Sequence, residues 1–137
     1  MEFRASHMYA RISARKVRPV VDLIRGLPVN RALERLDITP KRGAYLVGKV
    51  VRSALSNAQQ NADVELGKLR VSGAVVDDGP LLGGRLRWRP AARGRVSPIR
   101  KRTSHIRITL EDAPAGAEPT TSAAAEQETS DSAEQES

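Results

Sequence analysis

The residues best suited to chemistry in this chain are the arginines of residues 85–105, RLRWRPAARGRVSPIRKRTSH. This stretch holds seven Arg, one Lys and no acidic residue. Arginine binds phosphate through two parallel hydrogen bonds and also stacks on nucleobases, whereas lysine offers only a point charge. So much uncompensated positive charge opposes folding unless an anionic partner is present. The stretch therefore predicts a polyanion-binding segment, with these candidate contacts: Arg85, Arg87, Arg89, Arg93, Arg95, Arg100, Lys101 and Arg102.

Motifs for catalysis are missing from the sequence. It contains no P-loop, dinucleotide fingerprint, HExxH or GxSxG pattern. It also lacks cysteine, and two histidines, His7 and His105, are too few for a histidine metal cluster. Asp77 and Asp78 precede a Gly-Pro pair and are predicted to be turn residues rather than catalytic carboxylates. We expect no enzyme, cofactor, metal site or small-molecule substrate, and His105 is expected to be a hydrogen-bonding neighbour.

The formal charge of +7 divides sharply along the chain. Residues 1–110 hold all 23 basic residues and eight acids, whereas residues 111–137 hold eight acids and no base. A basic body with an acidic end indicates a polyanion partner. No apolar run reaches the ~18 residues of a membrane span, and the N-terminus lacks the apolar core of a secretory signal. The expectation is a soluble cytoplasmic protein with no membrane partner.

Two regions are predicted, a folded domain over residues 1–112 and a tail over residues 113–137. The tail has no aromatic and no branched aliphatic residue, so it cannot bury enough surface to offset its ordering entropy and should be disordered. One interpretation is a solubilising tail. The other is that the tail folds back and screens the basic segment until the true partner arrives.

Three helices are predicted before the basic segment. Apolar residues at helical spacing mark residues 12–26, which Ser13 can cap and Gly26 can end. A shorter helix capped by Asn30 follows, and a longer one starts at Thr39, whose successor is proline. The residues expected on the buried faces are Val17, Val20, Val21, Ile24, Val29, Ala32, Leu33, Leu36, Val47, Val50, Val51, Ala54, Leu55 and Ala58.

Two strands are predicted from alternating apolar residues. Residues 68–76 place Leu69, Val71 and Val75 on one side. In residues 105–110 the apolar side is formed by Ile106, Ile108 and Leu110.

Between these strands the basic stretch predicts a long hairpin over residues 79–105 that reverses at residues 90–94. Each arm has about 13 residues and reaches roughly 40 Å at ~3.3 Å per residue, whereas a compact 100-residue domain has a radius of gyration near ~13 Å. Most of the hairpin must then project beyond its own body. Because an isolated hairpin is marginal in water, we expect it to become ordered only when a partner surrounds it.

The first helix carries a second basic patch, opposite its apolar face. Beside the hairpin this patch is best interpreted as part of a shared RNA surface, with steeply salt-dependent binding. Its residues are Arg11, Arg15, Lys16 and Arg18.

Trp88, the one tryptophan, lies among arginines rather than on a predicted core face. Two interpretations remain open. The indole packs across the two strands of the hairpin, or it stacks on a base or lines a cavity wall.

Charge alone does not separate RNA from DNA. Architectural DNA-binding proteins also use basic β-arms, which follow the minor groove. Those of the histone-like type have short bodies and a phenylalanine-rich core, whereas this chain has one Phe and three predicted helices before the arm. Architectural DNA binding is therefore the alternative rather than the preferred function.

Four segments together resemble a known family. They are residues 10–26 (ARISARKVRPVVDLIRG), 53–61 (SALSNAQQN), 77–80 (DDGP) and 89–108 (RPAARGRVSPIRKRTSHIRI). In this order they resemble large-subunit ribosomal protein twenty-two of the bacterial type. The likeness extends over residues 5–110, and the RGR and KRTSHI elements are its most specific part.

The resemblance implies an α+β fold: three helices packed on a small three-stranded antiparallel sheet, with a long projecting β-hairpin. It implies that residues 4–10 supply the third strand. It further implies a structural constituent of the large ribosomal subunit that supports subunit assembly. The implied partners are the large ribosomal RNA, neighbouring large-subunit proteins and the nascent polypeptide in the exit tunnel, so the location is the cytoplasmic ribosome.

The resemblance also implies roles for individual residues. RNA contacts are implied for Lys16, Arg18, Arg93, Arg95, Arg100, Lys101, Arg102, Thr103, Ser104 and His105. The tip that lines the tunnel is implied for Trp88, Arg89, Pro90, Ala91, Ala92, Arg93 and Gly94. The segment between Pro80 and Pro90 is longer than the family pattern and contains Gly83 and Gly84, so a bulge or a register shift of the tip is expected.

Overall fold

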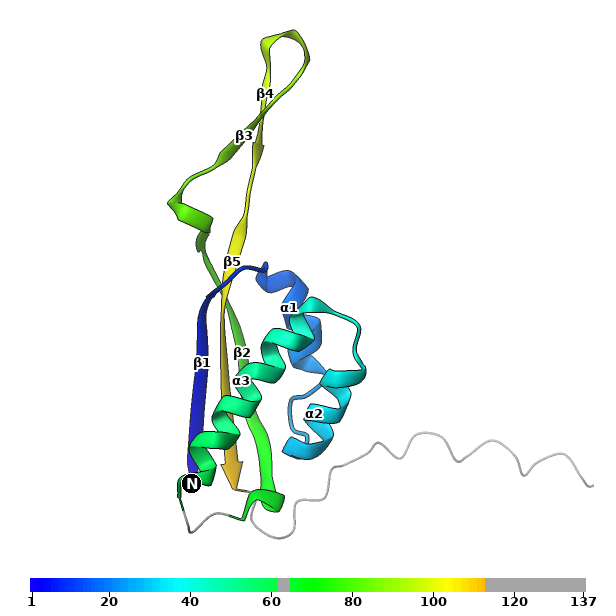
Figure 1. The fold of residues 1–137 in the computed structure, drawn as a ribbon, viewed down its shortest axis with the longest axis vertical. Helices are drawn as coiled ribbons and strands as arrows, with labels where there is room; N and C mark the ends of the chain where they lie inside the picture. The colour runs from blue at the N-terminus through cyan, green and yellow to red at the C-terminus, as the bar shows by residue number, and fades with distance from the viewer. Residues whose placement is uncertain (62–64, 113–137) are drawn as a thin grey trace, which may run out of the picture.

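The computed structural model describes residues 1–61 and 65–112. Across these residues, three helices lie on one face of a three-stranded antiparallel sheet, and a two-stranded ribbon extends beyond this body (Figure 1). The predicted α+β fold with a projecting hairpin is confirmed. The expectations for residues 113–137 lie outside the described residues. No helix in the described part of the chain is long and apolar enough to cross a membrane.

The helices are α1 (Ala14–Asp22), α2 (Val29–Ile38) and α3 (Arg42–Gln59). Their apolar faces are the predicted ones, and nearly every residue expected there is buried, with Leu33 and Leu55 partly buried. The core is built from small branched residues, so α1 and α3 pack closely. A Cβ at Gly43 of α3 would lie 3.5 Å from the carbonyl oxygen of Lys16 in α1.

The helix starts differ from their predicted positions. Ser13 occupies the N-cap of α1, but its hydroxyl makes no capping hydrogen bond. Pro28, not Asn30, is the N-cap of α2. α3 begins after Lys41 rather than at Thr39. Thr39 instead closes α2, because its hydroxyl donates a 2.7 Å hydrogen bond to a carbonyl in the last turn of that helix.

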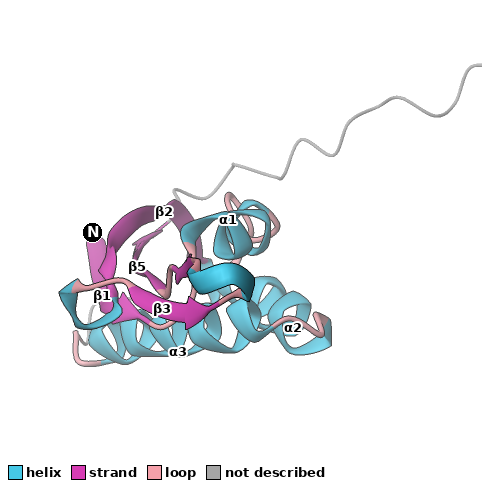
Figure 2. Ribbon diagram, turned by 90° about the horizontal axis from the view of Figure 1, so that it is seen from above, coloured by secondary structure: helices cyan, strands magenta, loops and turns pink. Residues whose placement is uncertain are grey.

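The sheet has the order β1–β5–β2, formed by β1 (Glu2–Ala10), β5 (Arg102–Asp112) and β2 (Leu69–Leu81). The N-terminal strand that the family resemblance implied is therefore present. Its partner is the central strand β5, where alternate residues Ile106, Ile108 and Leu110 are buried as predicted. Seen from above, the helices cover one side of the curved sheet and leave the other side open (Figure 2).

The prediction for Val75 in β2 is wrong. Leu69 and Val71 face the core, but Val75 is 51% exposed. The pairing with β5 shifts register between Val71 and Gly73, so Ala74 and its alternate neighbours turn inward instead. A bulge adds one residue to a strand. Because side chains alternate between the two faces of a sheet, the extra residue moves every later side chain of that strand to the opposite face.

The predicted turn at residues 77–80 is also wrong. β2 runs through it to Leu81, because Asp77 and Asp78 pair with the extended central strand at His105 and Ser104. The hairpin then has an interruption, a 3₁₀ turn over Leu82–Gly84. This turn lies in the longer segment between Pro80 and Pro90 and contains Gly83 and Gly84.

The outer part of the hairpin is a separate ribbon, which we call the arm and define as residues 85–100. It consists of β3 (Arg87–Pro90) and β4 (Val96–Ile99). The chain reverses between them in a 3₁₀ turn over Ala92–Gly94, as predicted. Arg93 and Gly94 there adopt left-handed backbones, with φ of 58° and 69°. The arm rises well clear of the helices (Figure 1).

Candidate nucleic-acid interface

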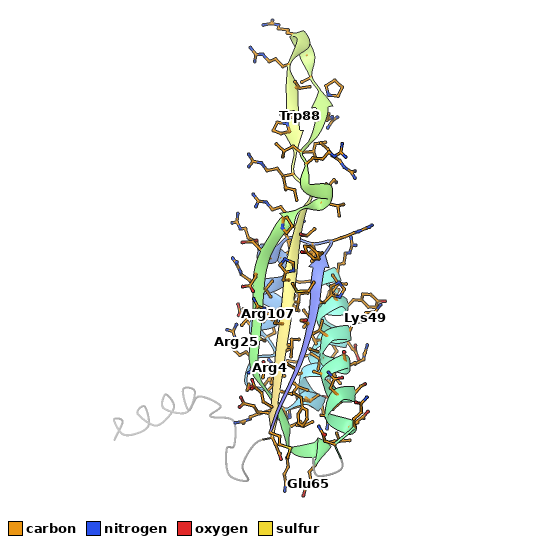
Figure 3. All side chains as sticks on the ribbon, turned by 90° about the vertical axis from the view of Figure 1, so that its left-hand side faces the viewer. Arg4, Arg25, Lys49, Glu65, Trp88 and Arg107 are labelled. Carbon is orange, nitrogen blue, oxygen red and sulfur yellow. The ribbon has the colours of Figure 1, made fainter. Side chains whose placement is uncertain are left out.

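The positive charge identified in the sequence lies on the arm and on its root, which we define as residues 101–105, where the arm meets the body. All eight basic side chains between residues 85 and 102 are exposed. Among the described residues, the ion pairs all lie on the body and none involves these eight. The side chains of the arm splay away from the ribbon (Figure 3). They are therefore free to contact an external anion.

The register of the arm gives it two different faces, because residues directly opposite each other in an antiparallel pair share a face. One face carries the arginines of β3, with Arg87 opposite Ile99 and Arg89 opposite Ser97. The other face is apolar. It pairs Trp88 with Pro98 and Pro90 with Val96.

Trp88 combines features of both interpretations offered for it. It lies opposite Pro98 across the ribbon, yet 60% of its surface remains exposed. Its position opposite Pro98 thus leaves more than half of the residue accessible. An exposed apolar face next to a basic one is suited to a partner with both phosphates and flat apolar rings.

Three residues implied as RNA contacts lie at the root of the arm, on β5. Thr103 and Ser104 are buried, and the Thr103 hydroxyl donates a hydrogen bond of 2.5 Å to the carbonyl of Pro80. His105 is partly buried, and its Nδ1 accepts a hydrogen bond of 3.1 Å from the backbone N–H of Tyr9. The expected hydrogen-bonding role of His105 is confirmed. In the free protein the hydrogen bonds of Thr103 and His105 join the start of β5 to β2 and β1.

The basic patch of α1 lies beside this root. Arg11, Arg15, Lys16 and Arg18 are all exposed. Figure 1 shows α1 beginning where the arm leaves the body. Arg18 contacts Asp78 of β2 at 3.4 Å, which ties the helix to the strand that leads into the arm. The exposed basic residues of α1 therefore lie near the strand that leads into the arm.

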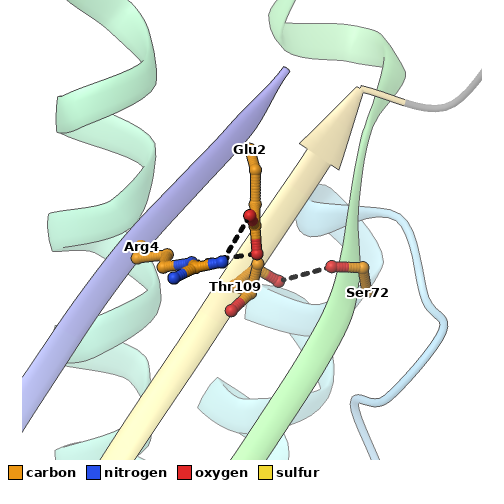
Figure 4. A network of polar contacts seen from close by, with 4 residues as sticks. All are labelled: Glu2, Arg4, Ser72 and Thr109. Atoms are coloured by element: carbon orange, nitrogen blue, oxygen red, sulfur yellow. Dashed lines mark hydrogen bonds and ion pairs between the residues drawn. The ribbon is translucent and has the colours of Figure 1, made fainter.

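Elsewhere on the body, many charges are balanced by close partners. On the open face of the sheet Arg4 binds Glu2 at 2.6 Å, and Ser72 donates to the carbonyl of Thr109 at 3.3 Å (Figure 4). The hydrogen bond from Arg4 lowers the pKa of Glu2, and the same bond raises the pKa of Arg4. The hydrogen bond from Lys68 to Glu65 likewise raises the pKa of Lys68.

The open face of the sheet also contains a hollow of about 460 Å³. Gly73 contributes to the hollow because it has no side chain, and Arg4 and Arg107 line it. Arg107 is bound to Asp77 and Arg4 to Glu2. The paired charges give this hollow no strong preference for an anion, in contrast to the arm.

The carboxylates considered as catalytic candidates have structural partners. Asp77 binds Arg107 and Asp78 binds Arg18. Within residues 1–61 and 65–112, no group of three His, Asp or Glu side chains is arranged to hold a metal ion. The exposed basic side chains of the arm and of α1 are instead suited to binding a polyanion.

Tyr9 was not among the candidate functional residues identified from the sequence. It lies at the end of β1, beside the root of the arm, and is 59% exposed with a left-handed backbone at φ 56°. Strand alternation predicts an inward-facing side chain at this position. Only the pairing of β1 with β5 reveals the irregularity, so no signal in the local sequence could have found it.

Comparison with known proteins agrees with this geometry. The family model described as Ribosomal protein L22p/L17e matches residues 5–111. A curated relative, "Large ribosomal subunit protein uL22" of Akkermansia muciniphila, is 48% identical over 112 residues. That alignment covers 82% of this chain and 97% of the relative. The matched residues include both the body and the whole arm.

Proposed function

The chain belongs to the ribosomal protein L22p/L17e family, and from this premise we propose that its arm is embedded in the large ribosomal RNA. As a member of the family, the chain is a structural constituent of the large subunit of the cytoplasmic ribosome. This membership favours ribosomal RNA over DNA as the polyanion. The finer proposal concerns which residues bind RNA and where the tip lies.

One observation carries the proposal: the arm projects from the body with exposed, unpaired arginines and with no acid of its own. A two-stranded ribbon of this kind buries almost nothing against its own chain. Phosphates supply the missing negative charge, and each neutralised phosphate releases counterions. RNA on several sides of the ribbon also supplies the surface that the ribbon needs to become rigid.

The two faces of the arm are expected to meet different surroundings. The face with Arg87 and Arg89 is suited to phosphates. The face with Trp88 and Pro90 is suited to bases or to a tunnel wall. At the tip, Ala91 and Ala92 are small and exposed, so they leave room for a passing chain. We assign the tip, residues 88–94, to the lining of the exit tunnel, with the nascent polypeptide as its partner.

A role in assembly follows from the shape of the arm. A ribbon that RNA encloses cannot be threaded in after the RNA has closed around it, so this chain must join while the large ribosomal RNA is still folding. The helix patch at Arg15 and Lys16 then anchors the body to RNA. The remaining surface of the body is available to neighbouring ribosomal proteins.

Sedimentation of cell lysate through a high-salt gradient tests the proposal. The full chain should stay with the large subunit at salt concentrations that remove nonspecifically bound basic proteins. A matched variant, in which a short turn replaces residues 85–99, should dissociate at lower salt because it has lost the five arginines of that segment and their phosphate contacts. Equal retention of the two chains would contradict the proposal, as would migration of the full chain with chromosomal DNA.

A further inference from the structure

We propose that Tyr9 is a stacking platform for an unpaired RNA base at the root of the arm. This inference rests on the proposed RNA-binding function and adds a contact that arginine and lysine do not provide. The chain has only two tyrosines, and Tyr9 is the one that contacts the root, through His105.

The irregular end of β1 places the Tyr9 ring in solvent. Along this strand, Phe3 is buried and His7 is partly buried, and regular alternation would turn Tyr9 inward as well. The pairing with β5 instead shifts between His7 and Ala10. Met8 and Tyr9 are then exposed in succession, and the small Ala10 takes the buried position. The strand thus presents a large aromatic ring where its pattern would have buried one.

The backbone and ring of Tyr9 are both held in place. Its φ of 56° lies in the left-handed region, which tyrosine seldom adopts. The backbone N–H donates to Nδ1 of His105 at 3.1 Å, and the two rings meet edge to face, with centroids 4.7 Å apart and planes at 78°. Local strain that the surroundings maintain at an exposed side chain points to a function. Tyr9 as a residue is 59% exposed, so much of its side chain is accessible to a partner.

The surroundings of Tyr9 favour a nucleobase over an apolar side chain of another protein. Arg11 follows it in the chain, and Arg102 lies at the start of β5, both exposed. The nearest carboxylates across β5 are Asp77 and Asp78, which already bind arginines. A strand of RNA can therefore place phosphates against free arginines and a splayed base against the ring, which is the usual combination in single-stranded RNA recognition.

Binding of the full chain to deproteinised large ribosomal RNA, measured over a range of salt with transfer RNA as competitor, tests this assignment. Tyr9→Gly removes the ring and suits the left-handed backbone, so its melting temperature should equal or exceed that of the parent chain. Its affinity should fall roughly 5- to 100-fold at every salt concentration. The slope of log affinity against log salt should not change, because no phosphate contact is lost.

Three further variants complete the test. Tyr9→Phe keeps the ring and should bind within about twofold of the parent chain. Tyr9→Asn also tolerates this backbone and should lose as much affinity as Tyr9→Gly. Tyr45→Ala is the matched control, since Tyr45 is an equally exposed tyrosine on α3, away from the arm, with the Lys49 ammonium 4.6 Å from its ring centroid. It should bind like the parent chain.

The outcomes separate this inference from the function on which it rests. Unchanged affinity in both Tyr9→Gly and Tyr9→Asn would overturn the stacking role while leaving RNA binding intact. A change in the salt slope rather than in the affinity would also overturn it, since that result indicates a phosphate contact. Absence of salt-dependent binding by the parent chain itself would refute the RNA-binding function.

Discussion

At the scale of single residues, the root of the arm depends on a position where a side chain does not fit. Gly79 of β2 lies against Thr103 of β5, and a Cβ there would be 2.5 Å from the Thr103 hydroxyl oxygen and 3.1 Å from Nε2 of His105. The same Thr103 hydroxyl binds the carbonyl of Pro80. Close packing of backbone and side chains therefore holds β2 and β5 together where the arm leaves the body.

Gly79→Ala is expected to destabilise the protein by about 1–3 kcal/mol, because the added methyl group must displace the Thr103 hydroxyl from its bond with Pro80. Thermal unfolding followed by circular dichroism measures the effect. Gly48→Ala on α3 is the control with the opposite sign. A Cβ there meets nothing within 4 Å, and alanine favours a helix interior by about 0.5–1 kcal/mol. A lower melting temperature for Gly48→Ala than for Gly79→Ala would contradict the packing argument.

The arginines near the tip are expected to act through phosphates. Arg93→Ala and Arg95→Ala should each reduce the slope of log affinity against log salt for ribosomal RNA by about one unit. Arg52→Ala is the matched control, because Arg52 is already bound to Asp37 on the body at 3.1 Å. If the slope were the same in all three variants, the arm arginines would not be phosphate contacts.

At the scale of elements, periodicity was sufficient for the helices and for the central strand, whereas local patterns failed where strand pairing decided the outcome. The alternation of Ile106, Ile108 and Leu110 survives because the extra residues at the register shifts lie in β1 and β2 rather than in β5. β2 has a register shift at Gly73, where a Cβ would lie 3.3 Å from Cβ of Thr109. The local pattern of β2 does not reveal that the Thr109 side chain of β5 lies against Gly73. For the same reason, the residues around Asp78 form a strand despite their turn-forming sequence.

The site was predictable to a similar degree. Composition alone identified the basic arm, because its arginines have no acids among them. Burial of Thr103 and Ser104, and exposure of Tyr9, depend on how β5 pairs with β1 and β2. Such long-range pairing cannot be read from a single stretch of sequence.

The arm should be less stable than the body to which it is attached. Every residue of β3 and β4 is exposed, so little holds the ribbon closed in the free protein. Hydrogen exchange of the isolated chain should therefore be fast for residues 85–100 and slow for residues 106–110. Within the large subunit, the arm should become protected. Strong protection of the arm in the free chain would refute its dependence on a partner.

At the scale of the whole molecule, charge is divided between a basic body with its arm and an acidic C-terminal segment. Residues 113–137 carry six acids and no base. If this segment screens the arm before assembly, a chain ending at Asp112 should bind unrelated RNA more tightly than the full chain at low salt. The difference should vanish near 1 M salt, where the screening length is ~3 Å. Equal affinities at low salt would instead leave the segment as a solubilising tail.

The most direct measurement is of where the tip of the arm lies within the large subunit. Because the chain has no cysteine, Ala92→Cys provides a single attachment point for an iron chelate that cleaves nearby RNA. Ser53→Cys on α3, another exposed position, is the matched control on the body. In assembled subunits, cleavage from residue 92 should map to RNA that lines the exit tunnel, and cleavage from residue 53 to different RNA on the outside of the subunit. Cleavage from residue 92 only at the outer surface, or none at all, would show that the arm is not embedded in the RNA.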